Sequence, residues 1–166
     1  MDIKKARIWY LVAACLLIGI VIFSIRWPGK NSALGESLTC HIYHYDSYKI
    51  LRTAVGADGA YYSFVPDSHY DSSFTFEFDR ESGSYIISEQ IQGVDYYLCM
   101  NDEHELCGSE SRDAQGCRWN VVRDGNSMYF FIVNASDDYA ISRVDSSGVE
   151  LHPFDANDDL QLMRLQ

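Results

Sequence analysis

The feature that most constrains the fold of this chain is a threefold recurrence of short apolar strands. The tripeptides "HIY", "YII" and "YFF" place Ile42, Ile86 and Phe130 at intervals of 44 residues. Strands that begin at Phe74, Cys117 and Leu160 recur at intervals of 43 residues. Self-similarity at a fixed period of this size indicates repeated supersecondary units. The sequence therefore predicts three copies of one structural unit.

Each unit has room for four strands, so the expected fold class is all-β. Past residue 36, short runs rich in Tyr, Phe, Val and Ile alternate with Gly, Asp, Asn and Ser, as strands alternate with turns. In each unit the second and third strands form a hairpin that opens on a tyrosine, at Tyr48, Tyr97 or Tyr139. The twelve expected strands lie near 40–44, 48–53, 60–65, 74–78, 85–89, 95–100, 105–108, 117–122, 128–133, 139–143, 149–153 and 160–165.

Three four-stranded units predict a β-trefoil, in which six strands close a barrel and three hairpins cover one end. Closure leaves no free sheet edge, and each unit buries its apolar face only against the other two. The alternative is an all-β sandwich with accidental spacing, although a sandwich does not require a near-constant interval between matching positions.

The first 30 residues have the pattern of a membrane segment. Residues 8–25 carry no charge, three cations precede them and Arg26 follows them. This length fits a membrane-spanning helix, and the excess of cations in front predicts a cytoplasmic N-terminus. We expect 1–30 to be a signal anchor or a signal peptide, 31–37 a linker and 38–166 the folded domain. The protein is then a single-pass membrane protein or a secreted one, with its domain in an extracellular or lumenal, oxidising compartment.

The domain is strongly acidic. After residue 30 the chain has 8 Lys and Arg against 23 Asp and Glu, a net formal charge of −15. Such a surface repels polyanions, which bind by releasing counterions to clustered cations. We therefore expect no nucleic-acid partner.

Four cysteines lie outside the apolar run, at Cys40, Cys99, Cys107 and Cys117. In an oxidising compartment they are expected to form disulfides, and three pairings are open. Their spacings of 59, 8 and 10 residues do not fit the short paired spacings of a zinc site. No C-x-x-C motif is present, which argues against a redox-active pair. Neither a metal nor a cofactor is expected.

The middle unit carries a specific succession of motifs. It has "YLCMN" at 97–101 and "ELCGS" at 105–109, followed by Cys117, Trp119 and Tyr129. This succession resembles the fibroblast growth factor family, and a looser resemblance extends over the whole folded domain. The turn between the two motifs departs from the family, since His104 stands where a glycine is usual.

The resemblance implies a β-trefoil ligand that binds the ectodomain of a receptor tyrosine kinase of the fibroblast growth factor receptor kind. It also implies a disulfide between Cys99 and Cys117, with Cys40 and Cys107 unassigned. The positions that match the family's receptor contacts are Thr39, Asn126 and Tyr129. Thr39 replaces the usual tyrosine, and Tyr129 falls one residue late.

The segment that should hold the family's heparin-binding cations lacks them. In "SRVDSSGVELHPFDANDDLQ", residues 142–161, Arg143 is the sole cation. The same segment carries Asp145, Glu150, Asp155, Asp158 and Asp159. A polyanion site needs several converging cations, so heparan sulfate is not an expected partner.

Two further predictions come from short motifs. "NAS" makes Asn134 a predicted N-glycosylation site in a surface turn after a strand. No G-x-S-x-G, P-loop or HExxH motif is present, so we expect no enzyme activity. If the receptor function is absent, the alternatives are a diverged β-trefoil binding module, lectin-like or protease-inhibiting, or a structural surface protein. The absence of the Q-x-W triplet of lectin trefoils argues against a lectin.

Overall fold

The computed structural model describes residues 33–47, 49–57, 59–67 and 72–166, which all belong to one compact unit, Ser32–Gln166. The apolar run 8–25, predicted to cross the membrane, lies outside the described residues. Within the described ranges, no helix has the length and apolarity needed to span a bilayer.

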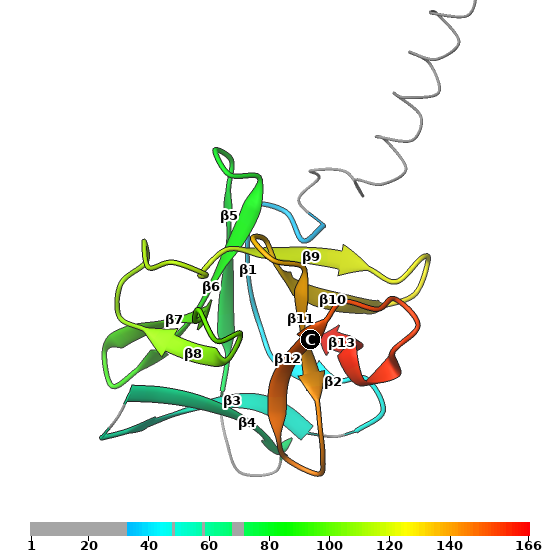
Figure 1. Ribbon diagram of the computed structural model, residues 1–166, viewed down its shortest axis with the longest axis horizontal. Helices are drawn as coiled ribbons and strands as arrows, with labels where there is room; N and C mark the ends of the chain where they lie inside the picture. Colours follow the sequence, from blue (N-terminus) through cyan, green and yellow to red (C-terminus); the bar gives the residue numbers. More distant parts are fainter. Residues whose placement is uncertain (1–32, 48, 58, 68–71) are drawn as a thin grey trace, which may run out of the picture. The chain divides into compact units, whose positions relative to one another are not determined.

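The described residues form an all-β fold (Figure 1). Thirteen strands and one 3-10 turn follow one another as β1 (Ser37–Cys40), β2 (Ile42–His44), β3 (Lys49–Gly56), β4 (Gly59–Pro66), β5 (Phe74–Asp79), β6 (Ser84–Ile91), β7 (Val94–Met100), β8 (Leu106–Ser109), β9 (Trp119–Arg123), β10 (Tyr129–Asn134), β11 (Tyr139–Arg143), β12 (Val149–Pro153), η2 (Asp159–Gln161) and β13 (Met163–Leu165).

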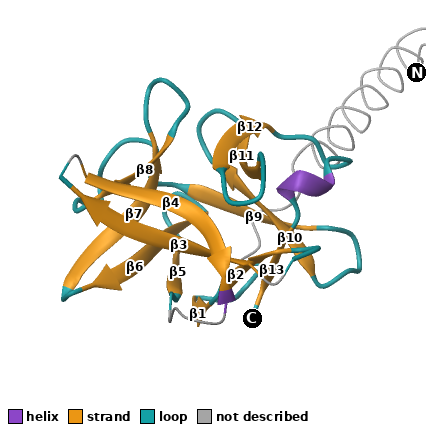
Figure 2. Cartoon of the chain, turned by 90° about the horizontal axis from the view of Figure 1, so that it is seen from below, coloured by secondary structure: helices purple, strands orange, loops and turns teal. Residues whose placement is uncertain are grey.

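Seven of these strands pair into a closed ring. The antiparallel pairings run β1 with β5, β5 with β6, β6 with β9, β9 with β10, β10 with β13, and β13 with β2. Only His41 separates β2 from β1, and its backbone exchanges hydrogen bonds of 2.7 and 3.1 Å with Gln166. Figure 2 shows β10 and β13 side by side on this ring. The ring therefore closes without a free edge.

Three hairpins, β3–β4, β7–β8 and β11–β12, complete the fold. Ala60 of β4 pairs with Gly108 of β8, and β12 contacts both of these strands. A side chain at Gly108 would overlap the Cβ of Ala60, so this close approach requires glycine. The amide of Phe64 donates to the carbonyl of Ser147 at 2.9 Å, which ties the first hairpin to the third.

The core is built from alternating strand residues. In β5, Phe74 and Phe76 are fully buried while the intervening Thr75 is half-buried, as expected for a strand with one face inward. Trp119 of β9 is fully buried, and its indole N–H donates to the carbonyl of Leu98 at 2.7 Å. Burying a large apolar side chain contributes roughly 1.5 to 3 kcal/mol each, which makes this cluster the main source of stability.

The observed strands differ from the twelve expected ones at both ends of the domain. The first expected strand, 40–44, begins earlier and is interrupted at His41, which yields two strands. The last, 160–165, shortens to Met163–Leu165 because Asp158 caps a 3-10 turn, accepting from the amide of Leu160 at 3.0 Å. A short Asp side chain that bonds the local backbone competes with strand pairing in this way.

Candidate binding site

A polar hollow of about 270 Å³ lies where three distant segments of the chain meet. The segments are the end of β7 with the turn after it, the loop before β9, and the turn after β10. The lining residues are Met100, Asn101, Asp102, His104, Gln115, Gly116, Ser136 and Asp137. The pocket that these residues line is called the hollow below.

The turn between β7 and β8 is held by the side chain of Asn101. Its Oδ1 accepts from the backbone amides of Glu103 at 3.0 Å and Glu105 at 2.8 Å, and its Nδ2 donates to the Glu105 carboxylate at 3.0 Å. His104 occupies the left-handed region, with φ of 60°. Asn101 thus fixes the backbone that presents Asp102 and His104 to the hollow.

One side of the hollow has an aromatic stack. The rings of His104 and Tyr139 lie nearly parallel, with centroids 4.2 Å apart and an interplanar angle of 17°. Tyr139 begins β11 and follows Asp138, another non-glycine residue with positive φ, 55°. The stack joins the β7–β8 turn to the β10–β11 turn and gives the hollow a flat ring at its edge.

A second wall of the hollow is the backbone of Gly116. Its carbonyl accepts from the backbone amide of Met100 at 3.1 Å and from the Asn134 side-chain amide at 2.7 Å. A Cβ at this position would overlap the carbonyl of Met100, so only glycine fits. Gln115 reaches across to the Asp102 carboxylate at 3.4 Å, which completes this side of the hollow.

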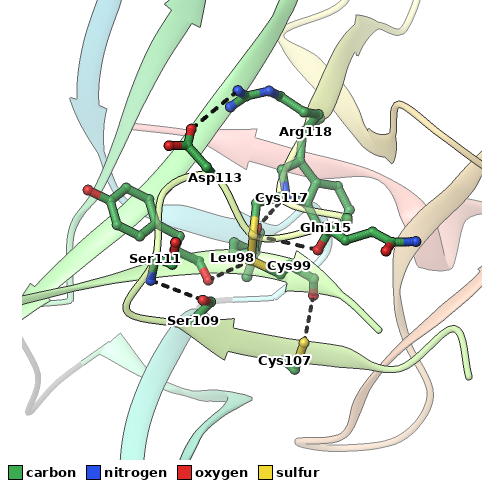
Figure 3. Close-up of a disulfide and its surroundings, with 12 residues drawn as sticks. Leu98, Cys99, Cys107, Ser109, Ser111, Asp113, Gln115, Cys117 and Arg118 are labelled. Atoms are coloured by element: carbon green, nitrogen blue, oxygen red, sulfur yellow. Dashed lines mark hydrogen bonds and ion pairs between the residues drawn. A yellow bond between two sulfur atoms is a disulfide. The ribbon is translucent and has the colours of Figure 1, made fainter. Parts of the chain in front are cut away.

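A disulfide joins Cys99 to Cys117, the residues next in sequence to Met100 and Gly116 (Figure 3). It is the pair that the family resemblance favoured. Cys99 precedes Met100 and Cys117 follows Gly116, so the bond fixes the two backbone segments that face each other across the wall. The loop before β9 is tied down a second time, because the Arg112 guanidinium binds the Glu77 carboxylate through contacts of 2.8 and 2.9 Å.

The other two cysteines among the described residues are free thiols. Cys40 is buried in the core, and desolvation raises its pKa to about 11. Cys107 is half-buried on β8, and burial followed by the nearby Glu105 carboxylate raises its pKa. The pairing of these two cysteines with each other, left open by the sequence, is not present.

The electrostatic character of the hollow is acidic. Asp102 and Asp137 are exposed at its rim, and no Lys or Arg is among its lining residues. Within the described part of the chain, no group of three or more His, Cys, Asp or Glu side chains is arranged to hold a metal ion. The hollow therefore offers hydrogen-bond acceptors, amides and an aromatic edge, and it disfavours anions.

The structure places Asn134 differently from the sequence-based prediction. The expected surface position is wrong, since Asn134 is fully buried as the last residue of β10. Its amide is engaged with Gly116, and its Oδ1 accepts from the backbone amide of Ser136 at 3.0 Å. In this conformation the Nδ2 atom has no room for a glycan.

The three positions matched to receptor contacts do not line the hollow. Thr39 is exposed on β1, with its hydroxyl 3.0 Å from that of Thr75. Asn126 is exposed in the β9–β10 turn. Tyr129 begins β10, is half-buried, and packs edge-on against Tyr45 with ring centroids 5.7 Å apart.

The last hairpin keeps the acidic character predicted for it. Arg143, the sole cation of residues 142–161, lies 3.4 Å from the Asp46 carboxylate and is mostly buried, with 20% of its side chain exposed. Its charge is thus paired with a carboxylate of the same chain and is not free to bind a polyanion.

Sequence reasoning did not identify the hollow as a site. Its residues come from segments that share no spacing pattern. Met100 and Asn101 belong to the "YLCMN" motif, but that motif indicated a strand and a family rather than a pocket. The available signal was His104, which stands where the resembled family usually has glycine. A bulky residue kept at a left-handed turn position points to a role for its side chain.

Comparisons with known proteins give fold-level similarity only. No protein-family model matches the sequence, and no curated protein matches it. The solved structure titled "SeviL bound to asialo-GM1 saccharide" is similar with a TM-score of 0.59 and 8% identity, over 77% of this chain and 95% of that one. The structure titled "Complex of lysenin with phosphocholine" is similar with a TM-score of 0.59 and 13% identity, over 80% of this chain and 45% of that one.

Proposed function

We propose that this protein is a β-trefoil binding module of the lectin-like kind, which binds a neutral saccharide in the hollow and performs no chemistry. The threefold repeat in the sequence, the closed ring and the three hairpins support the β-trefoil assignment. The structure of SeviL, titled as bound to a saccharide, is similar over most of this domain and supports the choice of ligand class.

The single observation that carries the proposal is the composition of the hollow. Carboxylates at Asp102 and Asp137 are acceptors for sugar hydroxyls, and Gln115 adds an amide that both donates and accepts. The ring of His104, held against Tyr139, offers a flat aromatic surface to the C–H face of a pyranose. A few convergent polar groups beside an aromatic surface are typical of small-ligand sites.

Charge selects among saccharides. With no cation among the lining residues and two carboxylates at the rim, sulfated and sialylated sugars are repelled. Neutral sugars escape this repulsion, and their hydroxyls make charge-assisted hydrogen bonds worth roughly 1.5 to 3 kcal/mol each.

The test is titration calorimetry of the full chain against neutral oligosaccharides chosen from a glycan array, with sulfated oligosaccharides alongside. Asp137→Ala should weaken binding about tenfold or more, since one charge-assisted hydrogen bond is lost. Asp113→Ala is the matched control, because Asp113 is also an exposed aspartate but does not line the hollow. The proposal fails if neutral sugars do not bind, or if both variants weaken binding equally.

A second candidate function is binding to a receptor ectodomain, as in the fibroblast growth factors. The observation that favours it is the Cys99–Cys117 disulfide, which some members of that family have. Pull-down on growth-factor receptor ectodomains tests it, with Thr39, Asn126 and Tyr129 each replaced by alanine. Capture that none of these three replacements weakens would reject the assigned contacts, and no capture would reject this function.

The same proposal extends to location. Residues 8–25 would hold the module at a membrane, with the domain on the extracellular or lumenal side. Extraction of the full chain in alkaline carbonate distinguishes an inserted anchor from a released, secreted domain.

A further inference from the structure

The free thiol of Cys107 lies on the strand next to Cys99, one of the two cysteines of the Cys99–Cys117 disulfide. In the β7–β8 hairpin, Cys99 and Cys107 are direct register partners. Opposed residues of an antiparallel pair project their side chains to the same face. The Cys107 thiol also lies 3.6 Å from the backbone carbonyl oxygen of Cys99. Figure 3 shows this thiol on the strand next to the Cys99–Cys117 bond.

The backbone at this position suits an alternative disulfide for Cys99. Opposed Cα atoms in antiparallel strands lie about 4.5 to 5.5 Å apart. Disulfides join Cα atoms that are about 4.4 to 6.8 Å apart, so register partners such as Cys99 and Cys107 fall in the range that a disulfide can bridge. Cys40 has no such relationship, since β1 pairs only with β5 among the described strands.

We propose that Cys107 exchanges with the Cys99–Cys117 disulfide, and that this exchange opens one wall of the hollow. Cys107 gives its proton to solvent, and its thiolate attacks the Sγ of Cys99. The Cys99–Cys107 bond forms as the Cys99–Cys117 bond breaks, and the Cys117 thiolate takes up a proton. One disulfide is exchanged for another, so the step needs no oxidant or reductant.

The consequence for the hollow follows from the position of Cys117. Its release removes the covalent link next to Gly116, whose carbonyl is then held only by hydrogen bonds from Met100 and Asn134. Gln115 and Gly116 form a wall of the hollow, so the backbone of the loop before β9 becomes more mobile where a bound saccharide would contact it. This part of the inference rests on the proposed saccharide site, whereas the exchange itself does not.

The rate of the exchange is controlled by pH. Only the thiolate attacks a disulfide, and the pKa of Cys107 is raised by burial and by Glu105. The thiolate fraction at neutral pH is therefore small, and the exchange accelerates as the pH rises.

The exchange is tested by mapping disulfides in the unmodified full chain. The protein is held at pH 7 and at pH 9, quenched in acid, alkylated and digested without reduction, and the peptides are identified by mass spectrometry. We expect a peptide pair joined through Cys99 and Cys107, with alkylated Cys117, to increase at pH 9. The yield should be unchanged on dilution, and the pair should be absent from Cys107→Ser.

Three outcomes overturn the exchange. The first is Cys99–Cys117 alone at every pH, with Cys107 alkylated. The second is a Cys107–Cys117 pair, which would show attack on the other sulfur. The third is a yield that falls on dilution, which would show exchange between molecules. None of these measurements uses a saccharide, so they stand or fall separately from the proposed function.

The opening of the wall has its own measurement. Hydrogen exchange of the Met100 amide, which donates to Gly116, should become about tenfold faster in the Cys99–Cys107 form. Peptides from β3 and β13 serve as internal references and should not change. Unchanged protection of Met100 after a completed exchange would reject the link between the thiol and the hollow.

Discussion

The side-chain amide of Asn134 donates a hydrogen bond of 2.7 Å to the carbonyl oxygen of Gly116. The bond joins the end of β10 to the loop before β9, across 18 residues of sequence. The same carbonyl also accepts from Met100, so Gly116 is the point at which β7, the loop and β10 are joined. The disulfide of the next residue, Cys117, fixes the same point covalently.

Asn134→Ala should lower the free energy of unfolding by about 1 to 3 kcal/mol, because it removes a buried hydrogen bond and leaves a cavity. Chemical denaturation monitored by tryptophan fluorescence measures this. Ser136→Ala is the matched control: it removes the same glycosylation motif but leaves the Asn134 amide and the Ser136 backbone N–H in place. A loss as large in the control would contradict the structural role of the amide.

The burial of Asn134 also predicts its modification state. The folded protein, produced in cells that glycosylate, should carry no glycan at this position, because the acceptor nitrogen is engaged and fully buried. Intact mass measured before and after glycosidase treatment checks this. A folded, fully glycosylated chain would be incompatible with the Asn134–Gly116 bond.

Gly116→Ala should be among the most destabilising changes at any glycine in the domain. Gly116 has φ of 74°, and an added Cβ would overlap the Met100 carbonyl, so strain and steric overlap combine to cost about 2 to 5 kcal/mol. Gly93→Ala is the control, since its φ is 86° but its Cβ would meet open space. It should cost about 1 kcal/mol. Equal losses in thermal denaturation would rule out the overlap.

His104→Gly should separate binding from stability. Glycine removes the strain of a left-handed backbone, which stabilises the fold by about 1 kcal/mol. Loss of the ring stack on Tyr139 destabilises it by a similar amount, so the free energy of unfolding should change little. Binding in the hollow should weaken because the ring is gone. His104→Asn removes the ring but keeps a side chain that tolerates positive φ, and it should weaken binding equally. Full binding by either variant would remove His104 from the site.

The sequence predicted the all-β class because the apolar repeat at Ile42, Ile86 and Phe130 is a property of strands that share one core. All three are buried on β2, β6 and β10. Ile42 and Phe130 pack in the main core cluster, whereas in β6 the residue that packs there is Ile87, next to Ile86. The register of Cys99 and Cys107 was also implicit, since both residues are two positions from the ends of the 101–105 turn. No C-x-x-C motif signals that relationship, because it arises from strand pairing rather than from spacing along the chain.

The hollow and the burial of Asn134 were beyond sequence reasoning for physical reasons. The hollow depends on left-handed backbone at His104 and Asp138. Asp and His adopt this conformation more often than most residues, but the residue type alone does not say at which positions they do. Asn134 lies on a strand whose last five residues are all buried, so the alternation that usually identifies an outward face is missing. A polar residue at the end of such a strand is then read as exposed, although the amide has a buried partner.

His44 should make the stability of the domain depend on pH. It is fully buried, its Nδ1 lies 2.6 Å from the Asp46 carboxylate, and Arg143 binds that same carboxylate. Burial, followed by the Arg143 charge, lowers the pKa of His44. The folded state therefore takes up a proton less readily than the unfolded chain, in which a histidine titrates near pH 6.5.

The direction of this pH dependence follows from proton binding. Above about pH 6.5 both states are neutral at His44, and the residue adds no pH dependence. As the pH falls below that value, His44 becomes protonated in the unfolded chain while it stays neutral in the folded state. The free energy of unfolding then falls, by at most about 1.4 kcal/mol per pH unit from this residue.

Denaturation of the wild type and of His44→Asn from pH 7.5 to pH 5 tests this. Asn can still donate to Asp46 but cannot titrate, so the variant's curve should be flatter by the contribution of one proton. His152→Asn, at a side chain that is 42% exposed, controls for the loss of a histidine as such. Parallel curves for the wild type and His44→Asn would mean that His44 does not govern the acid sensitivity of the fold.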